Sequence, residues 1–146
     1  MNEKDTNLDA INEVYRNASV ALLSISDVLP SIADVSLKKE ILEEYDGYEK
    51  LLGEISKYMA EKGYEAKELG TLKKFAMKSG IKMNTLMDDS ESNIAQIMIK
   101  GTVMGITELC ELLNNSENIT DEKIIEYATR LKELEETYEE RLKSYL

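Results

Sequence analysis

The sequence predicts an all-α protein, an up-down bundle of four long helices in which residues 1–146 form a single domain. Apolar residues recur every three or four positions in four separate stretches, the spacing of amphipathic helices. Residues that break helices are scarce, with one Pro and seven Gly among 146 residues. Charged residues make up 32% of the chain, as expected for helices with solvated outer faces.

The first long helix is predicted over about residues 8–32. Its apolar positions alternate three and four apart: Leu8, Ile11, Tyr15, Ala18, Leu22, Ile25, Leu29 and Ile32. Thr6 and Asp9 form a plausible capping pair at its start, and Pro30 should kink or end it. A second apolar stripe lies beside the first: Val14, Ala21 and Val28. The helix should therefore be buried on two sides, within the fold or against a second subunit.

The second long helix is predicted to begin near Ser36, whose side chain can cap it, and to stop at Gly63. Its apolar positions are Leu37, Ile41, Tyr45, Tyr48, Leu52, Ile55 and Met59. Gly47 interrupts this run and costs about 1 kcal/mol relative to Ala in a helix, so we interpret it as a close contact with another helix.

A shorter helix is predicted over residues 68–87, in the crossover between the second and third long helices. The third long helix, over about residues 91–114, should be capped by Ser90 or Ser92. It is apolar almost all round, which predicts a central position. Gly101 and Gly105 lie four residues apart, so they should let a neighbouring helix approach closely.

The last long helix should be capped by Thr120, with acidic residues in its first turn that suit the helix dipole. Its apolar positions are Ile124, Ala128, Leu131, Tyr138, Leu142 and Tyr145. A glutamate, Glu135, interrupts this regular series.

Three glutamates on apolar helix faces are the candidate functional residues: Glu44, Glu108 and Glu135. Inward carboxylates from three helices can hold a hard metal cation, or share a proton where they approach each other. The alternative is structural, because a glutamate at the edge of an apolar face often reaches water. Tyrosines on the same faces can also hydrogen-bond buried carboxylates and form a structural polar layer: Tyr15, Tyr45, Tyr48 and Tyr138.

Four long helices with a crossover between the second and third resemble the ferritin-like bundle superfamily, in particular its small uncharacterised bacterial members that lack the di-iron ligands. The resemblance covers nearly the whole chain. The di-iron sites of that superfamily use one Glu from each of two helices and a Glu-x-x-His motif from each of the other two. This chain has no His, and only Glu44, Glu108 and Glu135 match glutamate positions. The resemblance therefore implies the fold, whereas a ferroxidase or an oxygen-activating di-iron enzyme is strongly disfavoured.

Composition excludes several other classes. A net charge of −11 opposes binding to nucleic acid and to anionic membrane surfaces. The single cysteine, Cys110, cannot form an internal disulfide and fits a cytoplasmic protein with an inert core thiol. Without His, Ser–His and Cys–His catalytic pairs cannot form, and no nucleotide-binding motif is present, so we expect no cofactor.

These observations leave three hypotheses. The first is a non-catalytic bundle that acts by self-association, as a homodimer, or by binding a protein partner. The second is a degenerate ferritin-like bundle that binds a metal ion through Glu44, Glu108 and Glu135. The third is a pocket for an apolar small molecule between the Met-rich segment 68–87 and the third long helix.

Overall fold

The computed structural model describes residues 2–67 and 88–146, and it confirms an all-α bundle of four long helices. The predicted helix over residues 68–87 lies outside the described residues. The long helices are α1 (Glu3–Val28), α2 (Val35–Lys62), α4 (Glu91–Asn114) and α5 (Glu122–Leu142). Two short 3₁₀ turns follow α1 and α5: Leu29–Ser31 and Lys143–Tyr145.

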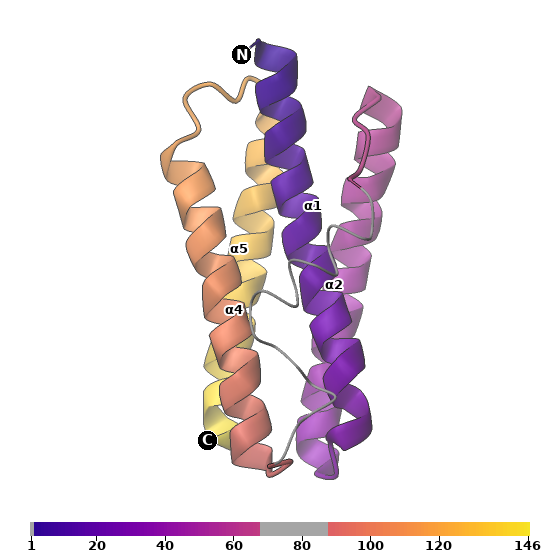
Figure 1. Cartoon of the computed structure of the whole chain (residues 1–146), viewed down its shortest axis with the longest axis vertical. Helices are drawn as coiled ribbons and strands as arrows, with labels where there is room; N and C mark the ends of the chain where they lie inside the picture. The colour runs from indigo at the N-terminus through magenta and orange to yellow at the C-terminus, as the bar shows by residue number, and fades with distance from the viewer. Residues whose placement is uncertain (1, 68–87) are drawn as a thin grey trace.

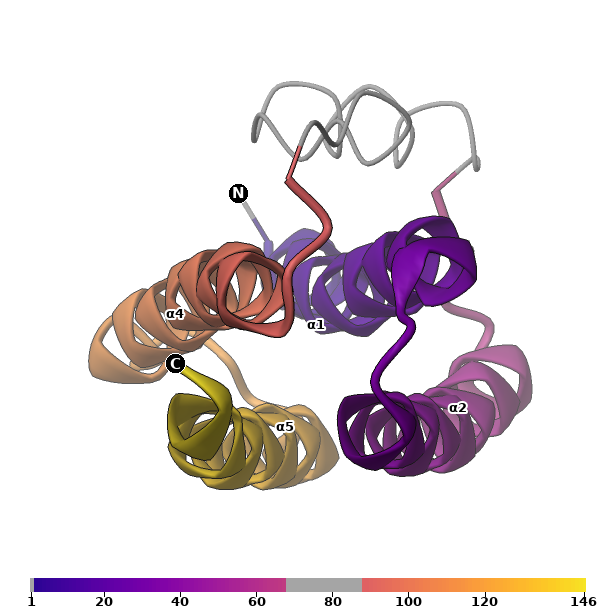
Figure 2. The ribbon, with the colours of Figure 1, turned by 90° about the horizontal axis from the view of Figure 1, so that it is seen from below.

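The four helices lie at the corners of a square in the order α1, α2, α5, α4 (Figure 2). Neighbours around the square run in opposite directions, and the diagonal pairs run in the same direction (Figure 1). Consequently α2 ends at one end of the bundle and α4 begins at the other, as a bundle with a long crossover requires. The tightest packing is between α4 and α5 and between α1 and α2, whereas α1 and α4 make fewer contacts.

The sequence correctly predicted where two helices end and which residue caps a third. Pro30 forms part of the 3₁₀ turn in which α1 ends, and Gly63 ends α2 with a left-handed φ of 73°. The α4 helix is capped by Ser90, whose hydroxyl accepts from the amide of Asn93.

Three predicted caps were wrong by one to four residues. The structure caps α1 with Asn2, α2 with Asp34 and α5 with Asp121, each accepting from a backbone amide of the first turn. The predicted caps have other partners: the Thr6 hydroxyl donates to the Asn2 carbonyl, the Ser36 hydroxyl pairs with that of Tyr145, and the Thr120 hydroxyl accepts from Asn7. Several short polar residues near a helix start can cap it, and tertiary contacts decide among them.

The second apolar stripe of α1 is internal. Val14 and Val28 are both fully buried in the single chain. Val14 and Val28 are therefore core of this fold, and Ala21 between them is half-buried. The central position predicted for α4 was wrong, because α4 lies at a corner like the others and exposes Val103 and Met104.

Three buried asparagines of α1 tie that helix to other segments. The Asn7 side chain bonds the Thr120 hydroxyl and the amides of residues 120 and 121. Asn12 bonds the backbone at Glu65 and Lys67. Asn17 donates from Nδ2 to the Gly105 carbonyl of α4 at 3.0 Å. Asn7 and Asn12 satisfy backbone groups outside regular helix, Asn17 adds a bond to a carbonyl inside α4, and together these bonds hold α1 against the rest of the bundle.

The close helix contact predicted at Gly47 is confirmed. A Cβ at Gly47 would overlap the hydroxyl oxygen of Tyr138 and lie 3.1 Å from its Cζ. The Tyr138 ring also packs against Tyr48, with ring centroids 5.4 Å apart. The absent side chain of Gly47 therefore allows α5 to place an aromatic ring directly on α2.

We expect Gly47→Ala to lower the free energy of unfolding by about 1–3 kcal/mol, since the added methyl must displace a buried tyrosine. Gly53→Ala is the matched control in the same helix, because nothing lies within 4 Å of its Cβ position. That change should stabilise the protein by about 0.5–1 kcal/mol through helix propensity. Urea denaturation of both variants measures the difference, and equal effects would contradict the close contact.

No helix in the described ranges combines the length and the apolar character that crossing a membrane requires.

Candidate functional site

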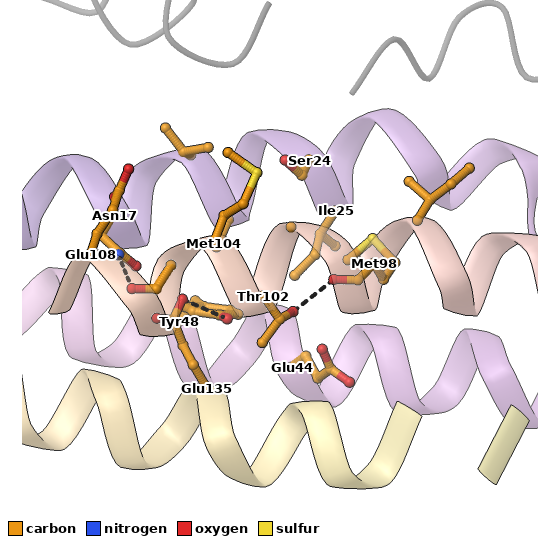
Figure 3. A pocket seen from close by; sticks show the side chains of 15 residues that line it. Asn17, Ser24, Ile25, Glu44, Tyr48, Met98, Thr102, Met104, Glu108 and Glu135 are labelled. Carbon is orange, nitrogen blue, oxygen red and sulfur yellow. Dashed lines mark hydrogen bonds between the residues drawn. The ribbon is translucent and has the colours of Figure 1, made fainter. Parts of the chain in front are cut away.

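A cavity of about 50 Å³ lies between the four helices and is partly open to solvent. That space holds roughly four water molecules. Most of its wall comes from α1 and α4, while α2 contributes Glu44 and Tyr48 and α5 contributes Glu135. Figure 3 shows these three side chains on the side of the cavity away from Met104 and Ser24. Met104 is 42% exposed, so the open side lies near it, between α1 and α4.

Glu135 is a fully buried ionisable group of this cavity. Its side chain is 2% exposed, and the Tyr48 hydroxyl donates to its Oε2 at 3.1 Å (Figure 3). Burial raises the pKa of Glu135 to about 8, with the Tyr48 hydrogen bond acting against this rise and the charge of Glu108 adding to it. Glu135 is therefore mostly protonated near neutral pH. Its Oε1 accepts no hydrogen bond from the described residues.

Gly105 and Asn17 complete the surroundings of this carboxyl. A Cβ at Gly105 would lie 2.8 Å from Oε2 and 2.9 Å from Oε1 of Glu135, so only glycine leaves room for the carboxyl against α4. This confirms the predicted close approach at Gly105. Asn17 of α1 lines the same cavity, and its Nδ2 donates to the Gly105 carbonyl while its buried Oδ1 has no donor among the described residues. The sequence analysis did not include Asn17, although its polar side chain lies directly before Ala18 of the predicted apolar face.

Glu44 is also buried, with 1% of its surface exposed. Its pKa is raised to about 10, first by burial and then by a hydrogen bond with Glu40, one helical turn earlier. The proton that Glu44 keeps can be donated to the Glu40 carboxylate across this bond. Arg141 lies 3.9 Å from the Glu40 carboxylate and balances its charge. The spacing of four residues could have revealed Glu40 as a partner of Glu44, because such pairs share a helix face.

Glu108 lies at the edge of the cavity and is half-buried. Burial raises its pKa, Arg16 acts to lower it, and Glu13 and Glu111 raise it further. The three predicted glutamates thus line one cavity, but they differ in surroundings. Glu44 is paired with Glu40, Glu135 with Tyr48, and Glu108 lies among the charges of α1 and α4.

The described residues contain no group of three or more Asp, Glu, Cys or His side chains arranged to hold a metal ion. Protonation also weakens two of the predicted ligands, because a metal requires the ionised carboxylate. The surroundings of Glu44 and Glu135 therefore suit carboxyls that keep their protons better than metal ligands.

A second polar cluster, missed by the sequence analysis, joins α2 to the start of α5. The hydroxyls of Tyr58 and Tyr64 donate to the Asp121 carboxylate at 2.6 and 2.8 Å. Burial acts to raise the pKa of Asp121, but the two tyrosines and the amide of Lys123 lower it. This carboxylate also caps α5, so the cluster holds a helix end in place.

Fold and site together define a four-helix all-α protein with a cavity lined by carboxyl groups inside its core. No family model matches the chain, and neither a curated protein nor a solved structure shows detectable similarity to it.

Proposed function

We propose that this chain is a non-catalytic binding protein whose cavity takes a small molecule with one polar group and an apolar body. The observation that carries the proposal is the buried Glu135 carboxyl, which lines the cavity and whose Oε1 has no hydrogen-bond partner among the described residues. A buried polar atom without a partner costs about 1–3 kcal/mol, so a ligand that pairs it gains that free energy on binding.

The wall of the cavity supports a ligand of this shape. Apolar side chains lie between Glu135 and the open side: Val20, Ala21, Ile97, Met98 and Met104. Ligand sites in helical bundles commonly combine an apolar lining with a few polar groups that fix orientation. This proposal develops the third hypothesis of the sequence analysis, with the cavity now among α1, α2, α4 and α5.

The other two hypotheses remain predictions. Kinship with ferritin-like bundles rests on the four long helices and on the parallel directions of α2 and α4, and metal binding rests on the three glutamates. Val14 and Val28 no longer support self-association as a homodimer, because both are internal. That hypothesis now rests on exposed apolar side chains of α2 such as Val35 and Leu42.

A thermal-shift screen tests the proposal with four classes of small compound: alkylamines, alcohols, amides and carboxylic acids. We expect at least one class to raise the melting temperature of the wild-type protein. Ala21→Leu, which fills the cavity from α1, should abolish that rise while leaving the fold intact. If no class stabilises the wild type, or if Ala21→Leu responds equally, the proposal fails.

Native mass spectrometry of gently purified protein tests all three hypotheses together. A bound small molecule supports the cavity, a bound metal lost in Glu108→Gln and Glu135→Gln supports the metal site, and a dimer supports self-association.

A further inference from the structure

Two oxygen atoms at the buried end of the cavity have no hydrogen-bond donor from the described residues: Oε1 of Glu135 and Oδ1 of Asn17. Both belong to residues that line the cavity, and the two residues lie on either side of Gly105. The orientation of each group is fixed. The Asn17 amide must point its Nδ2 at the Gly105 carbonyl, and the Tyr48 hydroxyl occupies Oε2 of Glu135.

Apart from the proton that Glu135 itself holds below its pKa of about 8, which an entering cation displaces, the donors near these oxygens are already in use. Asn17 Nδ2 and the Tyr48 hydroxyl donate as described, and the Thr102 hydroxyl donates to the Met98 carbonyl at 2.8 Å (Figure 3). The described residues that line the cavity include three glutamates and no lysine or arginine. A ligand must therefore bring its own hydrogen-bond donors, and a positive charge is complementary to this wall.

We infer that the cavity binds the protonated primary amine of a small alkylammonium ion, whose N–H groups donate to Glu135 Oε1 and Asn17 Oδ1. This inference rests on the proposed small-molecule function and names the ligand's polar group. The alkyl chain then lies along Ala21 and Met98 toward the open side. An ammonium group offers three N–H donors, enough for both oxygens.

Binding of an ammonium ion must displace a proton. In the free protein the Glu135 carboxyl has a pKa of about 8 and is protonated below that pH. In the complex the neighbouring ammonium cation favours the ionised carboxylate. One proton therefore leaves the carboxyl for solvent as the ammonium enters. The affinity for the ammonium ion should therefore increase about tenfold for each unit by which the pH rises toward about 8. Above that pH it should become constant.

The groups around Glu135 determine this behaviour. From α2 it faces Tyr48, with Glu44 beyond, and from α4 it faces Glu108. From α1 the neighbour is the uncharged Asn17, and Arg16 acts through Glu108. Since Glu44 keeps its proton to a higher pH than Glu135 does, Glu135 is the group that ionises on binding.

The test is an NMR titration of the full chain with n-butylammonium chloride, with butan-1-ol as the neutral compound of equal length and sodium chloride as the control for ionic strength. We expect n-butylammonium to shift amide signals of α1 and α4 around the cavity, and the Glu135 carboxyl carbon to report ionisation as it binds. Glu135→Gln should lower the affinity for n-butylammonium by about tenfold or more and leave the affinity for butan-1-ol unchanged. Glu136→Gln is the matched control, because it makes the same substitution at an exposed position on α5 outside the cavity.

The outcomes separate the inference from the proposed function. If butan-1-ol binds the wild type as tightly as n-butylammonium and Glu135→Gln changes neither, the ammonium inference is overturned while a small-molecule cavity stands. If neither compound binds and the thermal-shift screen finds no stabilising class, both fail. The pH dependence of n-butylammonium binding to the wild type repeats the test without any substitution, and an affinity independent of pH would overturn the inference.

Discussion

The free energy of unfolding is expected to fall as the pH rises from about 5 to about 8, because two buried carboxyls keep protons that the unfolded chain has released. Glu44 and Glu135 have pKa values near 10 and 8 in the folded protein, against 4.5 for an exposed glutamate. Between the unfolded and folded pKa values, the native state binds more protons than the unfolded state does. Stability then decreases with pH by up to about 1.4 kcal/mol per pH unit for each carboxyl.

Amide substitutions isolate this effect. Glu44→Gln and Glu135→Gln keep the shape of the protonated acid and cannot ionise, so each should change stability little near pH 5 and raise it by a few kcal/mol near pH 8. Gln at position 44 can still donate to Glu40, and Gln at position 135 can still accept from Tyr48.

Urea denaturation across this pH range measures the slope for each variant. Glu43→Gln, an exposed position on the same helix as Glu44, serves as the control for the loss of one negative charge. Should the wild-type profile prove flat, or should Glu43→Gln flatten it as strongly as Glu44→Gln does, the buried protons are absent and the cavity is charged instead.

The helices of this protein were predictable because helical periodicity is local. A residue at position i faces the same side as those at i+3, i+4 and i+7 whatever surrounds the helix, so Glu44 and Glu135 could be placed on inward faces from sequence alone. Gly47 and Gly105 were also readable as close contacts, since glycine inside a helix is unfavourable unless something occupies the space of its missing side chain.

The composition of the cavity was less predictable, because it depends on how the helices are rotated and shifted relative to one another. The Glu40–Glu44 pair lies within one helix and could be read from its spacing, whereas the meeting of Glu135 with Tyr48 of α2 and Gly105 of α4 could not. Asn17 shows the same limit, since its role follows from the carbonyl of a residue 88 positions away. The Tyr58–Asp121 pair, 63 residues apart, likewise joins helices whose relative placement is set by the whole core.

Gly105→Ala should lower the free energy of unfolding by about 1–3 kcal/mol, although alanine is the better helix former. The new methyl would lie 2.8 and 2.9 Å from the two carboxyl oxygens of Glu135, closer than a carbon can approach them. The carboxyl must then move away from α4, and its hydrogen bond from Tyr48 is lost or lengthened inside the core. Overpacking costs typically 1–3 kcal/mol and the buried hydrogen bond a similar amount, against about 1 kcal/mol gained in helix propensity.

A double-mutant cycle with Glu135→Ala assigns the cause. Truncation at position 135 removes the atoms that the new methyl would meet, so in that background Gly105→Ala should be neutral or stabilising. Tyr48 loses its acceptor in both members of that pair, and this cost cancels from the comparison. Equal destabilisation by Gly105→Ala in the two backgrounds would mean that the carboxyl does not lie against α4. Coupling of the expected sign would place the buried Glu135 carboxyl of α5 against Gly105 of α4, and this contact forms the wall that the ammonium site requires.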